Sequence, residues 1–246
     1  MISESTRTGG LRIDAGTDEV RAAKLEATQR LLGSTMGISD EQWQSPSRLP
    51  GWTRAHVATH LARNADALTR LVEELALGRH VPLYPSLAAR DQEIERGSER
   101  DGLALQIDLD TSAGRLHGAF DLLEEIPVSS VELAPGLEVE TSQLPTVRLS
   151  EALLHHLDLD VGFSLDDISA DAGRWLLAWV CFRLRRRMST PAMRIISDSG
   201  LTDRIGGSGY ATTVRGSDAA LAGWLSGRTG SDQLRGAQNL ALPLLG

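Results

Sequence analysis

The sequence is short of the residue types that define several classes of protein. The 246-residue chain has one cysteine, Cys181, which excludes an internal disulfide and any metal site built from several cysteines. A lone cysteine fits the reducing cytoplasm, where we expect the protein to reside. The first 16 residues lack the apolar core of a signal peptide. No stretch approaches the 18 uninterrupted apolar residues of a membrane span, so we expect no membrane partner.

Basic residues are also outnumbered. The chain has 25 Lys and Arg against 33 Asp and Glu, a formal charge of -8. Phosphate binding needs clustered cations, and the one basic run, Arg183 to Arg187, is offset by acidic surroundings. We therefore expect no nucleic-acid partner. With 41% hydrophobic and 24% charged residues, the chain has the composition of an ordinary globular protein. We also expect the protein to be a monomer.

Hydrophobic periodicity predicts helices over most of the first two thirds of the chain. Ser39 with Gln42 forms a capping-box pattern, and Thr53 is a good N-cap for a long helix that ends near Gly78. The region 127–147 contains three prolines and Gly136, and we expect a long irregular link there. The predicted helices cover about residues 17–33, 39–43, 53–78, 86–96, 103–125 and 146–161.

The pattern changes after residue 165. A helix is expected from about 166 to 187, followed by short strands at 193–197, 202–205 and 210–215 and a helix at 217–225. The prediction is therefore an all-helical domain over 1–165 and a smaller α+β domain over 166–246.

Four of the six histidines fall in two tight clusters on predicted helices. Residues four apart share a helix face, so Glu151 and His155 can converge on one point. The other helix offers His56 and His60. We favour His60 because it lies beside the buried-face residue Leu61. Asp158 could accept the remaining N–H of His155.

A carboxylate and two imidazoles from two helices would give three protein ligands, the usual number at a catalytic zinc site. The absence of thiolate suits zinc but leaves nickel, iron and manganese open. The simpler alternative is that each pair is a solvated contact on a helix surface. Arg228 has two interpretations as well: it could bind the carbonyls at a helix end or hold a carboxylate in a bidentate pair.

Three segments carry a resemblance to a known family. These are LPGWTRAHVATHLARNADAL at 49–68, VRLSEALLHHLDLDVGF at 147–163 and GWLSGR at 223–228. They resemble motifs of the mycothiol-dependent maleylpyruvate isomerase family. The resemblance implies a mainly α fold, in which a DinB-like four-helix bundle precedes a small α+β domain. It also implies a divalent metal, usually zinc, on His60, Glu151 and His155, and an activity-assisting arginine at Arg228.

The resemblance further implies a reaction, the conversion of maleylpyruvate to fumarylpyruvate with mycothiol as cofactor. Addition of a thiolate to the cis double bond leaves a single bond that rotates, and elimination then gives the trans product. A metal would make the thiolate available at neutral pH, since a free thiol has a pKa of roughly 8.5. The expected partners are thus a small dicarboxylate and a low-molecular-weight thiol. Arg228 is the first candidate to hold the substrate, and Arg54 and Arg148 are weaker ones. The alternatives are a mycothiol S-transferase acting on electrophiles and a non-catalytic metal-binding regulator.

Overall fold

The structure is a computed structural model that describes residues 10–185, 187, 189–238, 240 and 242–245. Within these residues the chain forms two compact units. The helical unit spans Gly16–Phe163, and the C-terminal unit combines the described parts of residues 1–15 and 164–246. Each unit is described by itself below.

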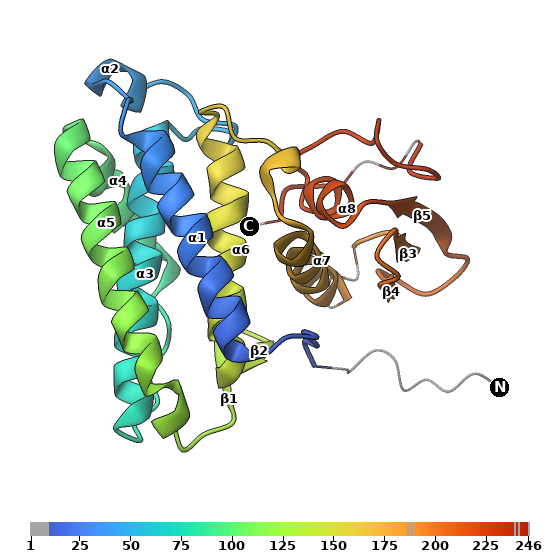
Figure 1. The fold of residues 1–246 in the computed structure, drawn as a ribbon, viewed down its shortest axis with the longest axis horizontal. Helices are drawn as coiled ribbons and strands as arrows, with labels where there is room; N and C mark the ends of the chain where they lie inside the picture. Colours follow the sequence, from blue (N-terminus) through green and yellow to red (C-terminus); the bar gives the residue numbers. More distant parts are fainter. Residues whose placement is uncertain (1–9, 186, 188, 239, 241, 246) are drawn as a thin grey trace. The chain divides into compact units, whose positions relative to one another are not determined.

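Four long helices form the framework of the helical unit, and every residue of this unit is described (Figure 1). Two of them, α3 and α5, come from the middle of the unit, and each of α1 and α3 packs against both α5 and α6. A shorter helix, α4, packs against α3. This arrangement confirms the predicted four-helix bundle. The helices are α1 (Thr17–Thr35), α2 (Asp40–Trp43), α3 (Arg54–Ala76), α4 (Leu87–Ser98), α5 (Gly102–Ala119) and α6 (Leu144–Leu159), with a 3-10 turn, η1, at Phe120–Glu125.

The helix starts follow the capping signals of the sequence. The Ser39 hydroxyl accepts a hydrogen bond from the Gln42 backbone N–H, and the Gln42 side chain accepts one from the Ser39 N–H, as a capping box requires. The Thr53 hydroxyl accepts a hydrogen bond from the His56 N–H at 3.4 Å. Both N-caps are confirmed, and Thr53 fixes the start of α3 two turns before His60.

The prediction of an irregular link at 127–147 is wrong. The structure has an antiparallel hairpin there, with strands β1 (Ser130–Ala134) and β2 (Leu137–Glu140), followed by a 3-10 turn, η2 (Thr141–Gln143). Buried Val131 and Val139 pair across the hairpin, while the glutamates beside them are exposed. This alternation is the pattern of a half-buried strand, and Pro135 and Gly136 mark the turn between two strands. Gly136 has φ +74, a value that glycine adopts without strain.

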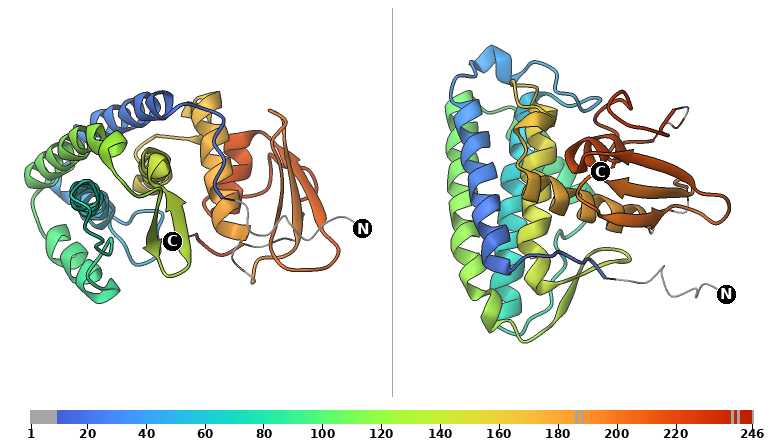
Figure 2. Two further views of the ribbon diagram at one scale, coloured as in Figure 1. Left: turned by 90° about the horizontal axis from the view of Figure 1, so that it is seen from below. Right: turned by 45° about the vertical axis from the view of Figure 1, so that its right-hand side comes forward.

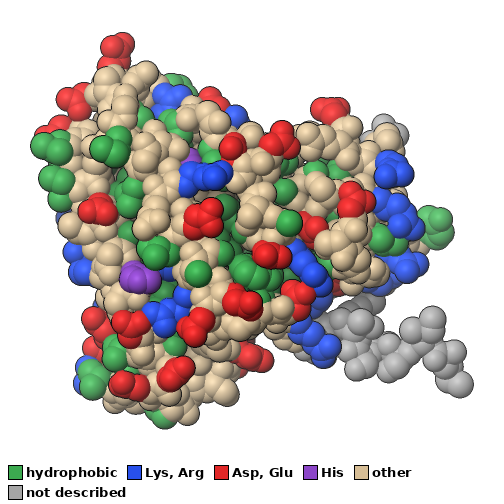
Figure 3. Space-filling view, viewed as in Figure 1, with side chains coloured by type: hydrophobic (Ala, Val, Ile, Leu, Met, Phe, Trp, Pro, Cys, Tyr) green, Lys and Arg blue, Asp and Glu red, His purple; other side chains and the backbone are tan. Residues whose placement is uncertain are grey.

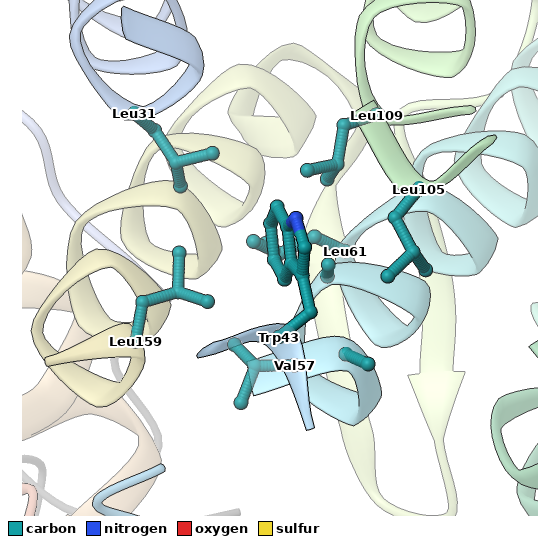
Figure 4. Close-up of a cluster of buried hydrophobic side chains, with 9 residues drawn as sticks. Leu31, Trp43, Val57, Leu61, Leu105, Leu109 and Leu159 are labelled. Carbon is teal, nitrogen blue, oxygen red and sulfur yellow. The ribbon is translucent and has the colours of Figure 1, made fainter. Parts of the chain in front are cut away.

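A buried tryptophan organises the end of the bundle where α3 begins. Trp43 of α2 is fully buried, and the side chains around it come from α1, α3, α5 and α6 (Figure 4). A Cβ atom at Gly102 would lie 2.6 Å from Trp43 Cδ1, so the close approach of α5 to this ring requires glycine. The labelled neighbours of Trp43 are Leu31, Val57, Leu61, Leu105, Leu109 and Leu159.

The C-terminal unit is an α+β structure, as predicted (Figure 2). Its sheet has the order β4-β3-β5, with β4 antiparallel and β5 parallel to β3. One face is covered, because α7 packs on β4 while α8 packs on β3 and β5. The elements are η3 (Leu165–Asp167), α7 (Ala170–Arg185), β3 (Met193–Ser197), β4 (Thr202–Ile205), β5 (Thr212–Gly216) and α8 (Asp218–Leu225).

Charged side chains mark the surface of the protein. Acidic and basic groups lie scattered among apolar and neutral ones on the face drawn in Figure 3. The helical unit has nearly twice as many Asp and Glu as Lys and Arg residues. Among the described residues, no helix combines the length and the apolar character needed to cross a bilayer.

Candidate metal centre

Two neighbouring helices of the bundle bring three potential ligands together. His60 lies on α3, and Glu151 and His155 lie one turn apart on α6. His60 Nε2 is 3.0 Å from Glu151 Oε2, and His155 Nε2 is 3.4 Å from the same oxygen. One donor atom from each side chain lies within 4.8 Å of the other two. The structure therefore converges two imidazoles and a carboxylate on one point.

The cluster is buried, and an acidic neighbour orients one of its imidazoles. His60 is 5% exposed, and the Glu151 and His155 side chains are 18% and 12% exposed. His155 Nδ1 donates to Asp158 Oδ2 at 2.8 Å, and Asp158 is fully buried. A carboxylate on Nδ1 directs Nε2 of the same ring toward the cluster, which is the arrangement that orients metal-binding histidines.

Burial and hydrogen bonding set the charges of the three groups. Burial lowers the pKa of His60 to about 4, so this imidazole is neutral at pH 7. Burial acts to raise the pKa of Glu151, but hydrogen bonds from His155 and His60 outweigh it and hold that pKa well below its usual range. Burial likewise opposes protonation of His155, but its bonds to Asp158 and Glu151 raise its pKa. The cluster thus presents an ionised carboxylate and a neutral imidazole at neutral pH.

An aromatic and cationic wall borders His60. The Trp52 ring centroid is 5.6 Å from that of His60, and Arg90 Nη2 is 3.3 Å from His60 Nδ1. The Arg90 guanidinium carbon lies 6.0 Å from the Trp52 ring centroid and 5.9 Å from that of Tyr84. These side chains come from the loop before α3, the loop before α4 and the first turn of α4 itself.

Comparison with known proteins agrees with this architecture. Residues 25–160, more than half of the chain, match the family described as the mycothiol maleylpyruvate isomerase N-terminal domain. The chain belongs to the mycothiol maleylpyruvate isomerase family. The family resemblance and the fold expected from it are thus confirmed, including the DinB-like bundle.

Two solved structures share the fold of this chain over nearly their whole length. Both are crystal structures of the mycothiol-dependent maleylpyruvate isomerase, one of them a histidine-to-alanine mutant. The mutant is 25% and the other 26% identical to this chain, and each has a TM-score of 0.84. In both cases the similarity covers 94% of this chain and 98% of the other. No curated protein matches the sequence.

The other histidine of α3, His56, makes different contacts from those of His60. His56 Nδ1 lies 2.7 Å from the Thr53 hydroxyl, and its Nε2 lies 3.3 Å from Glu95 Oε2 and 3.2 Å from the Ser98 hydroxyl. These contacts fasten the start of α3 to α4. The three-residue cluster contains His60 rather than His56.

The two weaker candidates for binding substrate are occupied by other contacts. Arg54 Nε donates to the Leu159 carbonyl at 2.7 Å and Nη2 to the Asp160 carbonyl at 3.2 Å, so Arg54 caps the C-terminal end of α6. Arg148 is 3% exposed, and its Nη1 donates to the Leu61 carbonyl and the Asn64 side chain. Arg148 is therefore shielded from solvent, and Arg54 is partly exposed but bonded to backbone carbonyls.

Arg228 lies in the C-terminal unit, directly after α8. Its Nη1 donates to the carbonyls of Ser226 and Leu245, each at 3.2 Å. The bond to Ser226, the C-cap of α8, fits the helix-end interpretation of this residue, and its role in activity stays a prediction. Sequence reasoning missed Trp52, Tyr84 and Arg90. Trp52 adjoins the N-cap of α3 and could have been noticed, whereas no local pattern marks the other two.

Proposed function

We propose that the protein is a metal- and mycothiol-dependent cis–trans isomerase that converts maleylpyruvate to fumarylpyruvate. The observation that carries this proposal is the convergence of His60, Glu151 and His155 within 4.8 Å, in a chain of the mycothiol maleylpyruvate isomerase family. We place the reaction in the cytoplasm, where a low-molecular-weight thiol stays reduced.

The donor set fits a divalent cation. Two imidazole nitrogens and one carboxylate oxygen are three ligands of the types that zinc takes at catalytic sites. Glu151 supplies the negative charge, and His155 is oriented by Asp158. When bound, the cation would lower the pKa of a thiol so that the thiolate exists at neutral pH. Zinc is the metal that we propose.

The chain itself offers no suitable nucleophilic sulfur. Cys181, its sole cysteine, is fully buried in α7, and burial raises the pKa of its thiol well above the usual value. A buried thiol of this kind is inert, because the thiolate is the reactive form. The sulfur for an addition–elimination isomerisation therefore comes from an external thiol, which agrees with the mycothiol dependence implied by the family.

His60 and the wall beside it have separate tasks in this proposal. With a pKa of about 4, His60 keeps a lone pair for a cation at pH 7 without first losing a proton. The Trp52 ring lies beside this imidazole, with the two ring planes tilted by 55°, and we propose that it restricts the access of water from that side. Arg228 is proposed to assist turnover through its positive charge.

Elemental analysis combined with a thiol-dependent assay tests the proposal. The purified protein is expected to hold about one zinc per chain and to change the ultraviolet absorbance of maleylpyruvate only when mycothiol is added. His60→Ala is expected to lose metal and activity together. His56→Ala, the same substitution one turn earlier on α3, is the matched control and is expected to keep the metal.

The fate of the thiol separates the three candidate functions. An isomerase leaves the thiol concentration unchanged, whereas an S-transferase consumes thiol in proportion to its electrophile. Metal binding without a change in either compound would indicate a regulator. Full metal occupancy in His60→Ala would refute the ligand assignment.

A further inference from the structure

Arg90 places a cation beside His60, one of the three residues of the proposed metal centre. It lies in the first turn of α4, and its Nη2 is 3.3 Å from Nδ1 of His60. Its side chain is 24% exposed, so part of this residue is in contact with solvent. Arg148, the nearby fully buried cation, has no comparable access.

The surroundings hold this guanidinium in place without using many of its N–H groups. Its central carbon lies about equally far from the ring centroids of Trp52 and Tyr84, at 6.0 and 5.9 Å. Contacts with ring faces restrict a guanidinium but consume no donor. The ion pair that the structure gives Arg90 is with Asp91 at 2.8 Å, and the Asp91 side chain is 63% exposed. A surface pair of this kind stabilises little.

The contact with His60 also changes when His60 serves as a ligand. A neutral imidazole carries one proton, and a ring that binds a cation through Nε2 carries that proton on Nδ1. Nδ1 then has no lone pair to accept a hydrogen bond from Arg90. The Nη2 donor must turn to another acceptor, and the best acceptor for a guanidinium is a carboxylate.

We propose that Arg90 binds a carboxylate of the substrate beside the metal centre and thereby selects dianionic over monoanionic ligands. This inference rests on the proposed function, because it deepens the account of the same site. An acidic helical unit repels a dianion, so a local cation is needed to hold one. Of the arginines near the cluster, Arg54 is bonded to helix-end carbonyls and Arg148 is buried, which leaves Arg90.

Binding of a small dicarboxylate to the zinc-loaded protein tests this role without turnover. The probes are maleate and its monomethyl ester, which differ by one negative charge, and their Kd values are measured by calorimetry without thiol. The wild-type protein is expected to prefer maleate at least about tenfold, since a charge-assisted hydrogen bond supplies that much discrimination.

Arg90→Gln is expected to weaken maleate binding about ten- to a hundredfold and to abolish the preference over the ester. Arg90→Lys is expected to retain part of the preference, because it keeps the charge but loses the bidentate geometry. The matched control is Arg96→Gln on the same helix. The Arg96 Nε donates to the Gln92 carbonyl. This control variant is expected to bind both probes as the wild type does. Zinc content is measured in every variant and is expected to stay constant.

Three results of the binding experiment would overturn the inference. Equal weakening of both probes in Arg90→Gln would mean that Arg90 only supports the surrounding rings. Wild-type affinity in that variant, or no preference for maleate in the wild-type protein, would exclude a carboxylate contact. The proposed function is judged separately: if maleylpyruvate is not isomerised but the Arg90-dependent preference is present, the inference stands and the isomerase proposal fails. If isomerisation occurs with an unchanged KM in Arg90→Gln, the reverse holds.

Discussion

Removing the charge of Asp158 is the most direct test of how the candidate metal centre is organised. Asp158 is fully buried and accepts a hydrogen bond from His155 Nδ1 at 2.8 Å. In Asp158→Asn, an amide oxygen of similar size can still accept this bond, but it carries no negative charge. The substitution therefore isolates the electrostatic contribution of Asp158 to the basicity of His155.

The size of the effect follows from the type of hydrogen bond. A bond with a charged partner contributes about 1.5–3 kcal/mol, and a neutral bond about 0.5–1.5 kcal/mol. The difference of about 1–1.5 kcal/mol corresponds to roughly a tenfold change in an equilibrium constant. Loss of the negative charge also weakens the hydrogen bond that does most to raise the pKa of His155. We expect zinc affinity to fall about ten- to a hundredfold.

Competition with a chromophoric chelator at pH 7 measures this affinity. Asp160→Asn is the matched control, because Asp160 lies two residues away, is exposed and pairs with Arg48. Its φ of 55 is a conformation that asparagine tolerates, so the fold should be preserved. A zinc Kd for Asp158→Asn within threefold of the wild type, in a variant with unchanged circular dichroism, would refute the idea that Asp158 tunes the ligand.

Three further predictions concern stability and turnover. Burial lowers the pKa of Lys24 from 10.5 to about 8. Between these two pH values the folded chain binds fewer protons than the unfolded chain. The buried positive charge therefore lowers the free energy of unfolding most below pH 8. Lys24→Met should raise the free energy of unfolding at pH 7 by about 1–3 kcal/mol, and denaturant titrations should show a smaller gain at pH 10. Gly102→Ala should lower the free energy of unfolding by about 1–3 kcal/mol, because the added methyl group would clash with Trp43. Gly114→Ala should not, because a methyl group at this position on the same helix would lie in open space. Arg228→Ala should leave the metal content unchanged and reduce kcat; an unchanged kcat would show that Arg228 does not assist turnover.

Part of the proximity of His60, Glu151 and His155 can be predicted from the sequence, because helical periodicity is a local property. Glu151 and His155 are four residues apart, so any regular helix places them on one face. The choice of His60 over His56 depends on the buried face of α3, which the apolar residues of that helix define. The structure brings together the same three residues. Whether they bind a metal stays a prediction.

The hairpin at 130–140 was missed for a different reason. The sequence of residues 131–140, VELAPGLEVE, alternates apolar and acidic residues on both sides of Pro135 and Gly136. The prolines and glycine of the region predict an interruption, but they do not say whether the flanking residues pair. Pairing depends on a buried surface that receives Val131 and Val139, and only the folded unit supplies it.

The arginines of the helical unit show what local sequence cannot decide. Arg63 and Arg100 are both bound to Asp108, Arg115 is bound to Asp66, and Arg54 is bound to the carbonyls of α6. Proximity in the sequence suggests Arg54 as a substrate ligand, because it lies six residues before His60. The structure instead brings Arg90 to His60 from thirty residues away. A cation is available to a ligand only if its neighbours leave its N–H groups unsatisfied, and this depends on which acceptors the fold places around it.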